Sequence, residues 1–253
     1  MNCEILSRCL TSNLARNGRA GWKRRLDLSG ARDPVAVLFG SFNQPPLINR
    51  ICDHMMQPAE IADSYDSIAH QWLEPHLTTN GIRQHEHALK FRPSGGLALD
   101  VGSGCNSRFI RLLASHGYEV EGLDVSAKMI SLARERNPNV TFYHADVCEW
   151  TPARHYDFIT AWDSIWHVPL DRGESVLRKL CGALAPGGVF IWTTGGLDGP
   201  EEKRDSTMGP PMYYSVLGIP KTLQTVSATG CVCRHLEFDQ FPEKHVFLIA
   251  QKA

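Results

Sequence analysis

Short apolar runs alternate with amphipathic segments from the middle of the chain onward. The runs at 97–101, 118–124, 140–144, 156–162 and 189–194 predict five β-strands. Segments between them carry apolar residues at helical spacing, which predicts helices with one face turned toward a sheet. This alternation of strands and helices predicts an α/β fold, in which helices cover both faces of a parallel sheet.

Two more strands are predicted near the C-terminus, at 231–238 and 245–251, after a helix near 221–229. Only a few residues join these strands. A crossover between parallel strands needs about a dozen residues, so we expect this pair to be antiparallel. The polar stretch 195–214 is predicted to be a substrate-facing insertion, because long loops beside an α/β crevice often determine specificity.

The N-terminal part of the chain differs from the rest. Residues 1–55 show no sustained periodicity. We expect a poorly ordered extension there, or a start codon placed too far upstream, rather than a transit peptide, because acidic residues interrupt the basic ones. Residues 56–253 are predicted to form one domain. It opens with a helix over 60–74, where Tyr65, Ile68 and Trp72 recur at helical spacing.

Composition narrows the classes of function. The chain has 26 basic and 27 acidic residues, so no overall field would attract a polyanion, which argues against nucleic-acid binding. No apolar run is long enough to span a membrane. The eight cysteines show no CxxC spacing, and this usage fits a reducing cytoplasm better than secretion. Cys231 and Cys233 supply two ligands where a zinc site needs four, so we predict core residues and no metal.

The most informative segment is a glycine-rich turn after the first strand. The strand ends in Asp100, and Gly102, Ser103 and Gly104 then form a Gly-x-Gly turn that opens a helix. Glycines in such a turn permit a tight bend and let the backbone approach a ligand closely. The alternative is a turn that uses glycine only for its bend.

Two acidic residues at the ends of the next strands favour the ligand-binding interpretation. Asp124 closes the second strand, 20 positions after Gly104, where a carboxylate can accept hydrogen bonds from both ribose hydroxyls of an adenosine ligand. Asp146 follows the third strand and can accept a hydrogen bond from the adenine amino group. The alternatives are a solvated acid at the strand end for Asp124 and a helix N-cap for Asp146.

From about residue 65 to the C-terminus, the chain resembles the class I S-adenosylmethionine-dependent methyltransferases of the small-molecule type. The turn at 100–104 resembles their first motif, and 122–126 resembles the ribose-binding segment. Segments 145–147, 156–159 and 184–188 are similar to the later motifs, and 65–69 resembles a lid helix. The resemblance implies a Rossmann-like seven-stranded, mostly parallel sheet with an antiparallel last strand, and S-adenosylmethionine as the cofactor.

The resemblance also implies a set of cofactor-binding residues. These are Tyr65, Asp100, Gly102, Ser103, Gly104, Asp124, Val125, Met129, Asp146, Val147 and Trp162. The family usually has a third glycine where this chain has Asn106, and asparagine tolerates left-handed backbone geometry, so we expect the turn to survive. A nicotinamide-binding Rossmann domain fits worse, because its motif needs glycine at Ser107.

Candidates for the chemical step lie after the fourth strand. Methyl transfer requires a nucleophile aligned with the activated methyl group, and His167 could take a proton from it; a packing role is the alternative. Trp166, Tyr213, Tyr214 and His245 are predicted to line the substrate pocket, although the tyrosines equally suit pinning of the insertion to the core.

We therefore expect methyl transfer to an oxygen or nitrogen of a small-molecule acceptor. A tRNA or rRNA methyltransferase and a noncatalytic S-adenosylmethionine-binding protein are the alternatives.

Overall fold

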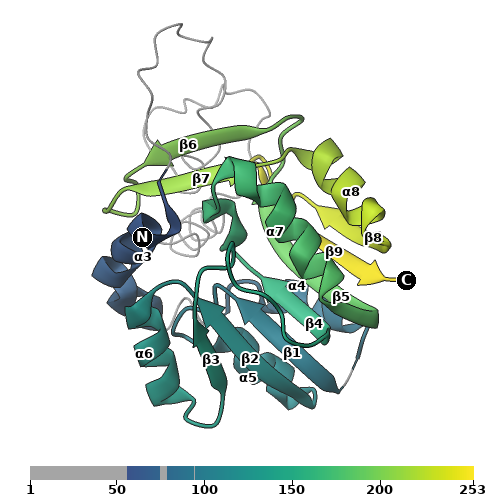
Figure 1. Cartoon of the computed structure of the whole chain (residues 1–253), viewed down its shortest axis with the longest axis horizontal. Helices are drawn as coiled ribbons and strands as arrows, with labels where there is room; N and C mark the ends of the chain where they lie inside the picture. The colour runs from purple at the N-terminus through teal and green to yellow at the C-terminus, as the bar shows by residue number, and fades with distance from the viewer. Residues whose placement is uncertain (1–55, 75–78, 94) are drawn as a thin grey trace, which may run out of the picture.

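A seven-stranded sheet forms the centre of the structure, a computed structural model that describes residues 56–74, 79–93 and 95–253. The prediction for residues 1–55 lies outside these ranges. The strand order is β3-β2-β1-β4-β5-β9-β8 (Figure 1). The strands of this sheet are β1 (Gly96–Val101), β2 (Tyr118–Asp124), β3 (Thr141–His144), β4 (Tyr156–Ala161), β5 (Leu184–Gly195), β8 (Cys231–Glu237) and β9 (His245–Lys252).

The direction of the strands agrees with the sequence. All pairs among β1 to β5 are parallel. β9 is antiparallel to both of its neighbours, β5 and β8. The predicted mostly parallel sheet with an antiparallel last strand is therefore confirmed. One boundary differs, because β5 begins at Leu184 rather than at Val189 and so includes the predicted turn 186–188.

Helices cover both faces of the sheet. One face carries α7 (Leu170–Gly182) and α8 (Ile219–Ala228), and the other carries α4 (Ile82–Leu89), α5 (Arg108–Ser115) and α6 (Ala127–Arg136). Alternate residues of a strand point to opposite faces, so Leu99 packs on the α7 side and Ala98 on the α5 side.

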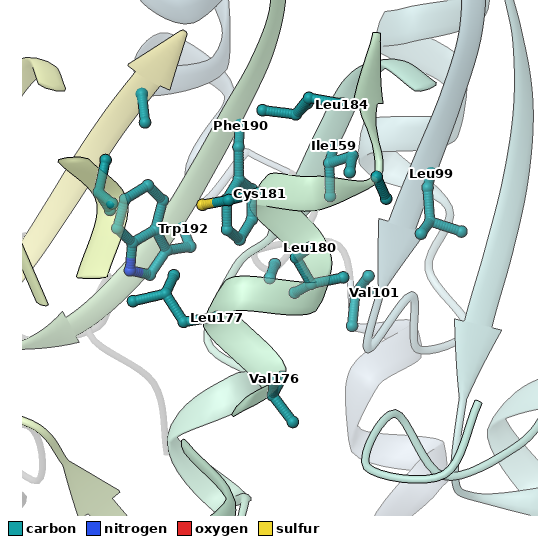
Figure 2. Close-up of a cluster of buried hydrophobic side chains, with 14 of the residues drawn as sticks. Leu99, Val101, Ile159, Val176, Leu177, Leu180, Cys181, Leu184, Phe190 and Trp192 are labelled. Atoms are coloured by element: carbon teal, nitrogen blue, oxygen red, sulfur yellow. The ribbon is translucent and has the colours of Figure 1, made fainter. Parts of the chain in front are cut away.

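The α7 side of the core shows how a helical stripe meets the sheet. Figure 2 shows Leu177 and Leu180 of α7 among strand residues that include Phe190 and Trp192. Burying each of these leucines contributes about 1.5–3 kcal/mol. The helix therefore holds β4 and β5 in place, and their carboxyl ends form part of the site.

The strand order reverses beside β1, which places a crevice there. β1 pairs with β2 on one side and with β4 on the other, so the chain leaves the sheet in opposite directions from adjacent strands. In open α/β sheets, ligands bind at such a point, outside the carboxyl ends of the strands.

The predicted opening helix is divided into two parts. α3 (Pro58–Ile68) is α-helical, and the 3-10 helix η1 (Ala69–Leu73) follows it. The backbone N–H of Gln57 donates to the Glu60 carboxylate at 2.7 Å, half of the reciprocal capping that fixes a helix start. The sequence did not predict α4, whose apolar residues are too few to give a clear period.

The insertion predicted over 195–214 is not a loop. It forms a separate two-stranded antiparallel sheet, made of β6 (Glu201–Asp205) and β7 (Met212–Val216). β6 consists only of charged residues, so no apolar alternation marks it as a strand. β7 is buried at every position, because it packs against α3 and against the short 3-10 helix η3 (Ile165–His167).

Candidate functional site

One cavity lies at the carboxyl ends of β1, β2 and β4. It encloses about 940 Å³ of empty space, part of which is open to solvent, and this volume is typical of small-molecule sites. Most of the residues proposed from the sequence line it. They are Tyr65, Gly102, Ser103, Gly104, Asp124, Val125, Met129, Asp146, Val147, Trp162 and His167. Asp100 does not line the cavity. It is buried in β1, and burial raises its pKa to about 7.

The glycine turn forms the floor of this cavity. Gly102 and Gly104 both have positive φ, at 69° and 55°. A Cβ added to Gly102 would lie 2.2 Å from the Cβ of Ser164, whereas one added to Gly104 would meet nothing within 4 Å. Gly102 is therefore required for packing, and Gly104 leaves its backbone open to the cavity.

The expectation for Asn106 needs a correction. The residue with left-handed geometry is Ser107, with φ of 58°, and not Asn106. The Asn106 side chain instead accepts a hydrogen bond from the Arg108 N–H at 3.1 Å, which caps the start of α5. The Ser107 hydroxyl accepts from the Asn137 side chain at 2.5 Å, which helps to hold the unusual geometry.

Asp124 ties the end of β2 to the glycine turn. Its carboxylate accepts the Gly104 N–H at 2.8 Å through one oxygen and the Ser126 N–H at 2.9 Å through the other. Burial raises its pKa, and these two hydrogen bonds oppose that effect. Each oxygen keeps lone-pair capacity for a further donor. Asp124 can therefore accept hydrogen bonds from a ligand without leaving the turn.

Asp146 stabilises the loop after β3. Its carboxylate accepts the Cys148 N–H at 2.8 Å. The residues that follow form a turn rather than a helix, so the helix N-cap alternative does not apply. Asp146 lines the same cavity as Asp124, flanked by Ala145 and Val147.

Three polar atoms in the cavity wall lack partners. Among the described residues, the Ser103 hydroxyl and the indole nitrogens of Trp72 and Trp162 are buried without a hydrogen bond. Native structures rarely leave such groups unsatisfied, so a ligand that supplies partners is the simplest explanation. Together with the Asp124 and Asp146 carboxylates, this set of donors and acceptors fits an adenosine-bearing ligand.

His167 is fixed in one neutral form. Its Nδ1 lies 2.7 Å from the Tyr213 carbonyl oxygen and donates to it, so Nε2 is an acceptor. Nε2 accepts the Trp166 indole N–H at 3.1 Å and lies 2.8 Å from the Tyr65 hydroxyl. Burial lowers the pKa of His167 to about 4. The sequence proposed His167 and Tyr65 separately, and the structure joins them in one hydrogen-bonded pair.

The substrate-binding candidates lie behind the cavity wall. Trp166, Tyr213, Tyr214 and His245 are buried, and none of them lines the cavity. Tyr213 accepts the Leu170 N–H at 3.1 Å, and Tyr214 packs on Trp166. The structure therefore places these four residues outside the lining of this cavity. Because α3 and η3 bury the whole of β7, its tyrosines pin the insertion to the core.

Sequence reasoning missed two charged residues of the cavity. Arg108 is the first residue of α5, and Asp163 follows β4; both line the cavity. Asp163 lies next to Trp162, which the sequence did propose. Neither residue belongs to a motif by itself. Their place in the cavity depends on the packing of elements that are distant in the sequence, so local patterns could not identify them.

The fold is a Rossmann-like α/β fold, and part of the chain is similar to methyltransferase domains. Residues 98–188 match the family of methyltransferase domains. A structural relative is the 1,6-didemethyltoxoflavin-N1-methyltransferase of Burkholderia thailandensis, with a TM-score of 0.60 and 15% identity over 83% of this chain and 99% of that chain. At this identity, the likeness shows the fold.

Two curated relatives are also similar to this chain. A dTDP-3-amino-3,6-dideoxy-alpha-D-glucopyranose N,N-dimethyltransferase of Streptomyces fradiae is 28% identical over 134 residues, 52% of each protein. A trans-aconitate 2-methyltransferase of Rhodopseudomonas palustris is 37% identical over 158 residues, 58% of this chain and 61% of the relative. The chain thus matches about half to three-fifths of the length of these relatives.

No helix in the described ranges is both long enough and apolar enough to cross a bilayer.

Proposed function

We propose that the protein binds S-adenosylmethionine and transfers its methyl group to an oxygen or nitrogen of a small-molecule acceptor. One observation carries the proposal: the glycine turn, Asp124 and Asp146 surround a single cavity, as an adenosine ligand requires. The relatives support a small acceptor, because their names refer to an amino-sugar nucleotide and to trans-aconitate.

The cavity residues would divide the work of binding. Asp124 would accept hydrogen bonds from the ribose hydroxyls, and Asp146 would accept one from the adenine amino group. The Ser103 hydroxyl and the Trp162 indole N–H would gain partners that the protein does not give them. The bound cofactor supplies an electrophilic methyl group on a sulfonium, so the protein must mainly align the acceptor and exclude water.

Tyr65 and His167 would handle the acceptor's proton. Trp166 donates to His167 Nε2, and an indole nitrogen cannot accept in return, so Nε2 remains an acceptor. The Tyr65 hydroxyl hydrogen then points to Nε2, and its oxygen can accept a hydrogen bond from the nucleophile. The proton would pass from the nucleophile to the Tyr65 oxygen while the Tyr65 proton moves to His167.

The low pKa of His167 makes it a weak base, which favours acceptors that need little deprotonation before attack. Amines and carboxylates fit that description. Burial destabilises the imidazolium form of His167, and the negative charges of Asp163 and Asp205 partly offset this effect on its pKa. For an amine acceptor, the base would take the proton that the nitrogen gives up on methylation, whereas a carboxylate acceptor would have no proton to remove.

The test combines binding with methyl transfer. Calorimetric titration with S-adenosylhomocysteine should show one site, and labelled cofactor should label an acceptor in a library of small metabolites. Labelled tRNA or rRNA instead would favour the nucleic-acid alternative. Tight binding without any labelled product would favour a noncatalytic role. Absence of binding would refute the proposal.

A further inference from the structure

A single lysine holds the loop that carries Asp146. The Lys179 ammonium donates to the carbonyl oxygens of Val147, Cys148 and Trp150, at 2.9, 2.8 and 2.7 Å. An ammonium has three protons, so these three hydrogen bonds use all of them. None of the described residues forms an ion pair with Lys179. The backbone carbonyl groups are therefore its direct partners, and we call this arrangement the Lys179 clamp.

The Lys179 clamp is anchored in the core. Lys179 lies in the last turn of α7, and Leu177 and Leu180 of the same helix pack into the buried cluster beside the sheet (Figure 2). A cation in the last turn also suits the helix dipole, which is the alternative role for this residue. Because α7 cannot shift without opening the core, the ammonium is a fixed point for the loop after β3.

Two peptide groups pass the effect of the clamp to Asp146. In a trans peptide, the C=O and the N–H point in opposite directions. The Val147 C=O faces Lys179, and the N–H of the same peptide group, that of Cys148, donates to the Asp146 carboxylate at 2.8 Å. The Cys148 C=O also faces Lys179, and the N–H of Glu149 donates to the Asp146 carbonyl oxygen at 3.0 Å. Lys179 therefore orients two peptide groups that hold Asp146.

Arg172 makes a second contact with the same loop. Its guanidinium donates to the Cys148 carbonyl oxygen at 3.3 Å and to the Glu149 carboxylate at 2.6 Å. The side chains of Arg172 and Glu149 are both exposed, so salt and water weaken their ion pair. Lys179, with three shorter hydrogen bonds, is therefore the main side-chain support of the loop.

We propose that Lys179 is a positioning residue for adenine recognition. It orients the peptide groups of residues 147–149, and these fix the Asp146 carboxylate where it accepts a hydrogen bond from the adenine amino group. The inference rests on the proposed function. Lys179 does not line the cavity, so it affects the ligand only through Asp146 and its loop. A protein without the clamp would still bind the nucleoside but would discriminate less between adenine and other bases.

The test compares S-adenosylhomocysteine with S-inosylhomocysteine by calorimetric titration. The second ligand has an oxygen in place of the adenine amino group, so it presents an acceptor where Asp146 needs a donor. We expect the wild-type protein to bind S-adenosylhomocysteine at least about tenfold more tightly, because the wrong base leaves the carboxylate without its partner. Lys179→Met keeps the length of the side chain without its donors, and it should lower this ratio at least about threefold.

A matched control is Lys252→Met. The Lys252 ammonium also donates to a backbone carbonyl oxygen, that of Thr229 at 2.5 Å, but it lies outside the cavity lining. This variant should keep the wild-type ratio. Lys179→Arg retains a cation in the last turn of α7 and gives a second reading if Lys179→Met does not fold. Its planar guanidinium cannot converge on three carbonyl oxygens in the same way, so the ratio should fall here too.

Asp146→Ala shows whether Lys179 acts through Asp146. This variant should lose the preference for S-adenosylhomocysteine, because the acceptor for the amino group is gone. Adding Lys179→Met should change the ratio no further, since residues that act in one network are not additive. A further fall of the ratio in the double variant would reveal another route and overturn the proposal.

The outcomes are distinguishable. A lower ratio in a folded Lys179 variant, together with the wild-type ratio in Lys252→Met, supports the positioning role. An unchanged ratio, or an equal loss of both affinities, overturns it and leaves Lys179 a structural residue. Equal binding of the two ligands by the wild-type protein also overturns the inference but leaves the proposed function standing. Failure of both ligands to bind refutes the proposed function itself.

The ammonium group provides an independent reading in the wild-type protein. Proton–nitrogen NMR at low temperature should show slowly exchanging Nζ protons for Lys179, because its three hydrogen bonds protect them from water. Lys90 is exposed and serves as the reference for fast exchange. Exchange at Lys179 as fast as that at Lys90 would overturn the clamp.

Discussion

Replacement of Asp124 by alanine should weaken the binding of S-adenosylhomocysteine far more than it weakens the fold. The carboxylate is the acceptor for two backbone N–H groups and, in our proposal, for two ribose hydroxyls. Hydrogen bonds to a charged group contribute about 1.5–3 kcal/mol each, so losing two of them costs about 3 kcal/mol or more. Since about 1.4 kcal/mol is a factor of ten, affinity should fall at least about 100-fold.

The loss of stability should be smaller. The N–H groups of Gly104 and Ser126 lose their acceptor, but Gly104 faces open space that water can enter. Calorimetric titration measures the affinity, and a thermal melt measures the fold. The control is Asp171→Ala, which removes an exposed carboxylate from the first turn of α7 and should change neither. A folded Asp124→Ala variant with unchanged affinity would reject the ribose assignment.

Three other predictions address the same site. Tyr65→Phe should lower kcat by about tenfold or more with little change in cofactor affinity, because it breaks the 2.8 Å contact to His167; an unchanged kcat would exclude the proton relay. Gly102→Ala should destabilise the protein by several kcal/mol in denaturant unfolding, since its Cβ would overlap Ser164; wild-type stability would contradict the packing role. Burial lowers the pKa of His245, but the hydrogen bonds and charges of Asp163 and Asp239 outweigh this effect. The pKa of His245 is therefore about 9 in the folded protein, above its value of 6.5 in the unfolded chain. The charged ring therefore contributes roughly 3 kcal/mol to the free energy of unfolding. This contribution is complete below pH 6.5 and is lost as pH rises through 9. His245→Gln should flatten that loss, and parallel unfolding curves of the two proteins across this range would refute it.

The sequence predicts the sheet well because the strands give strong local signals. Each parallel strand is an apolar run, and a helix follows the glycine turn at 102–104, as the sequence predicts. The antiparallel pairing of the last two strands follows from the short connection between them. The hairpin of β6 and β7 escapes prediction, because β6 carries only charged residues and tertiary contacts alone make β7 a strand.

The candidate site also contains residues that local sequence motifs identify and residues whose positions depend on distant contacts. The glycine turn, Asp124 and Asp146 belong to local motifs at strand ends, so sequence reasoning could place them in one crevice. Tyr213 and Tyr214 lie on an element whose packing partners are distant in the sequence, so their burial could not be foreseen.

The charged end of the cavity illustrates why pairing must be seen in three dimensions. Arg108 and Asp163 are ordinary residues at a helix start and after a strand, and both form hydrogen bonds with Asn80, which precedes α4, a helix that the sequence did not reveal. Burying the Arg108 guanidinium without an ion pair to any described residue costs free energy, and the left-handed backbone of Asp163 carries a cost of its own.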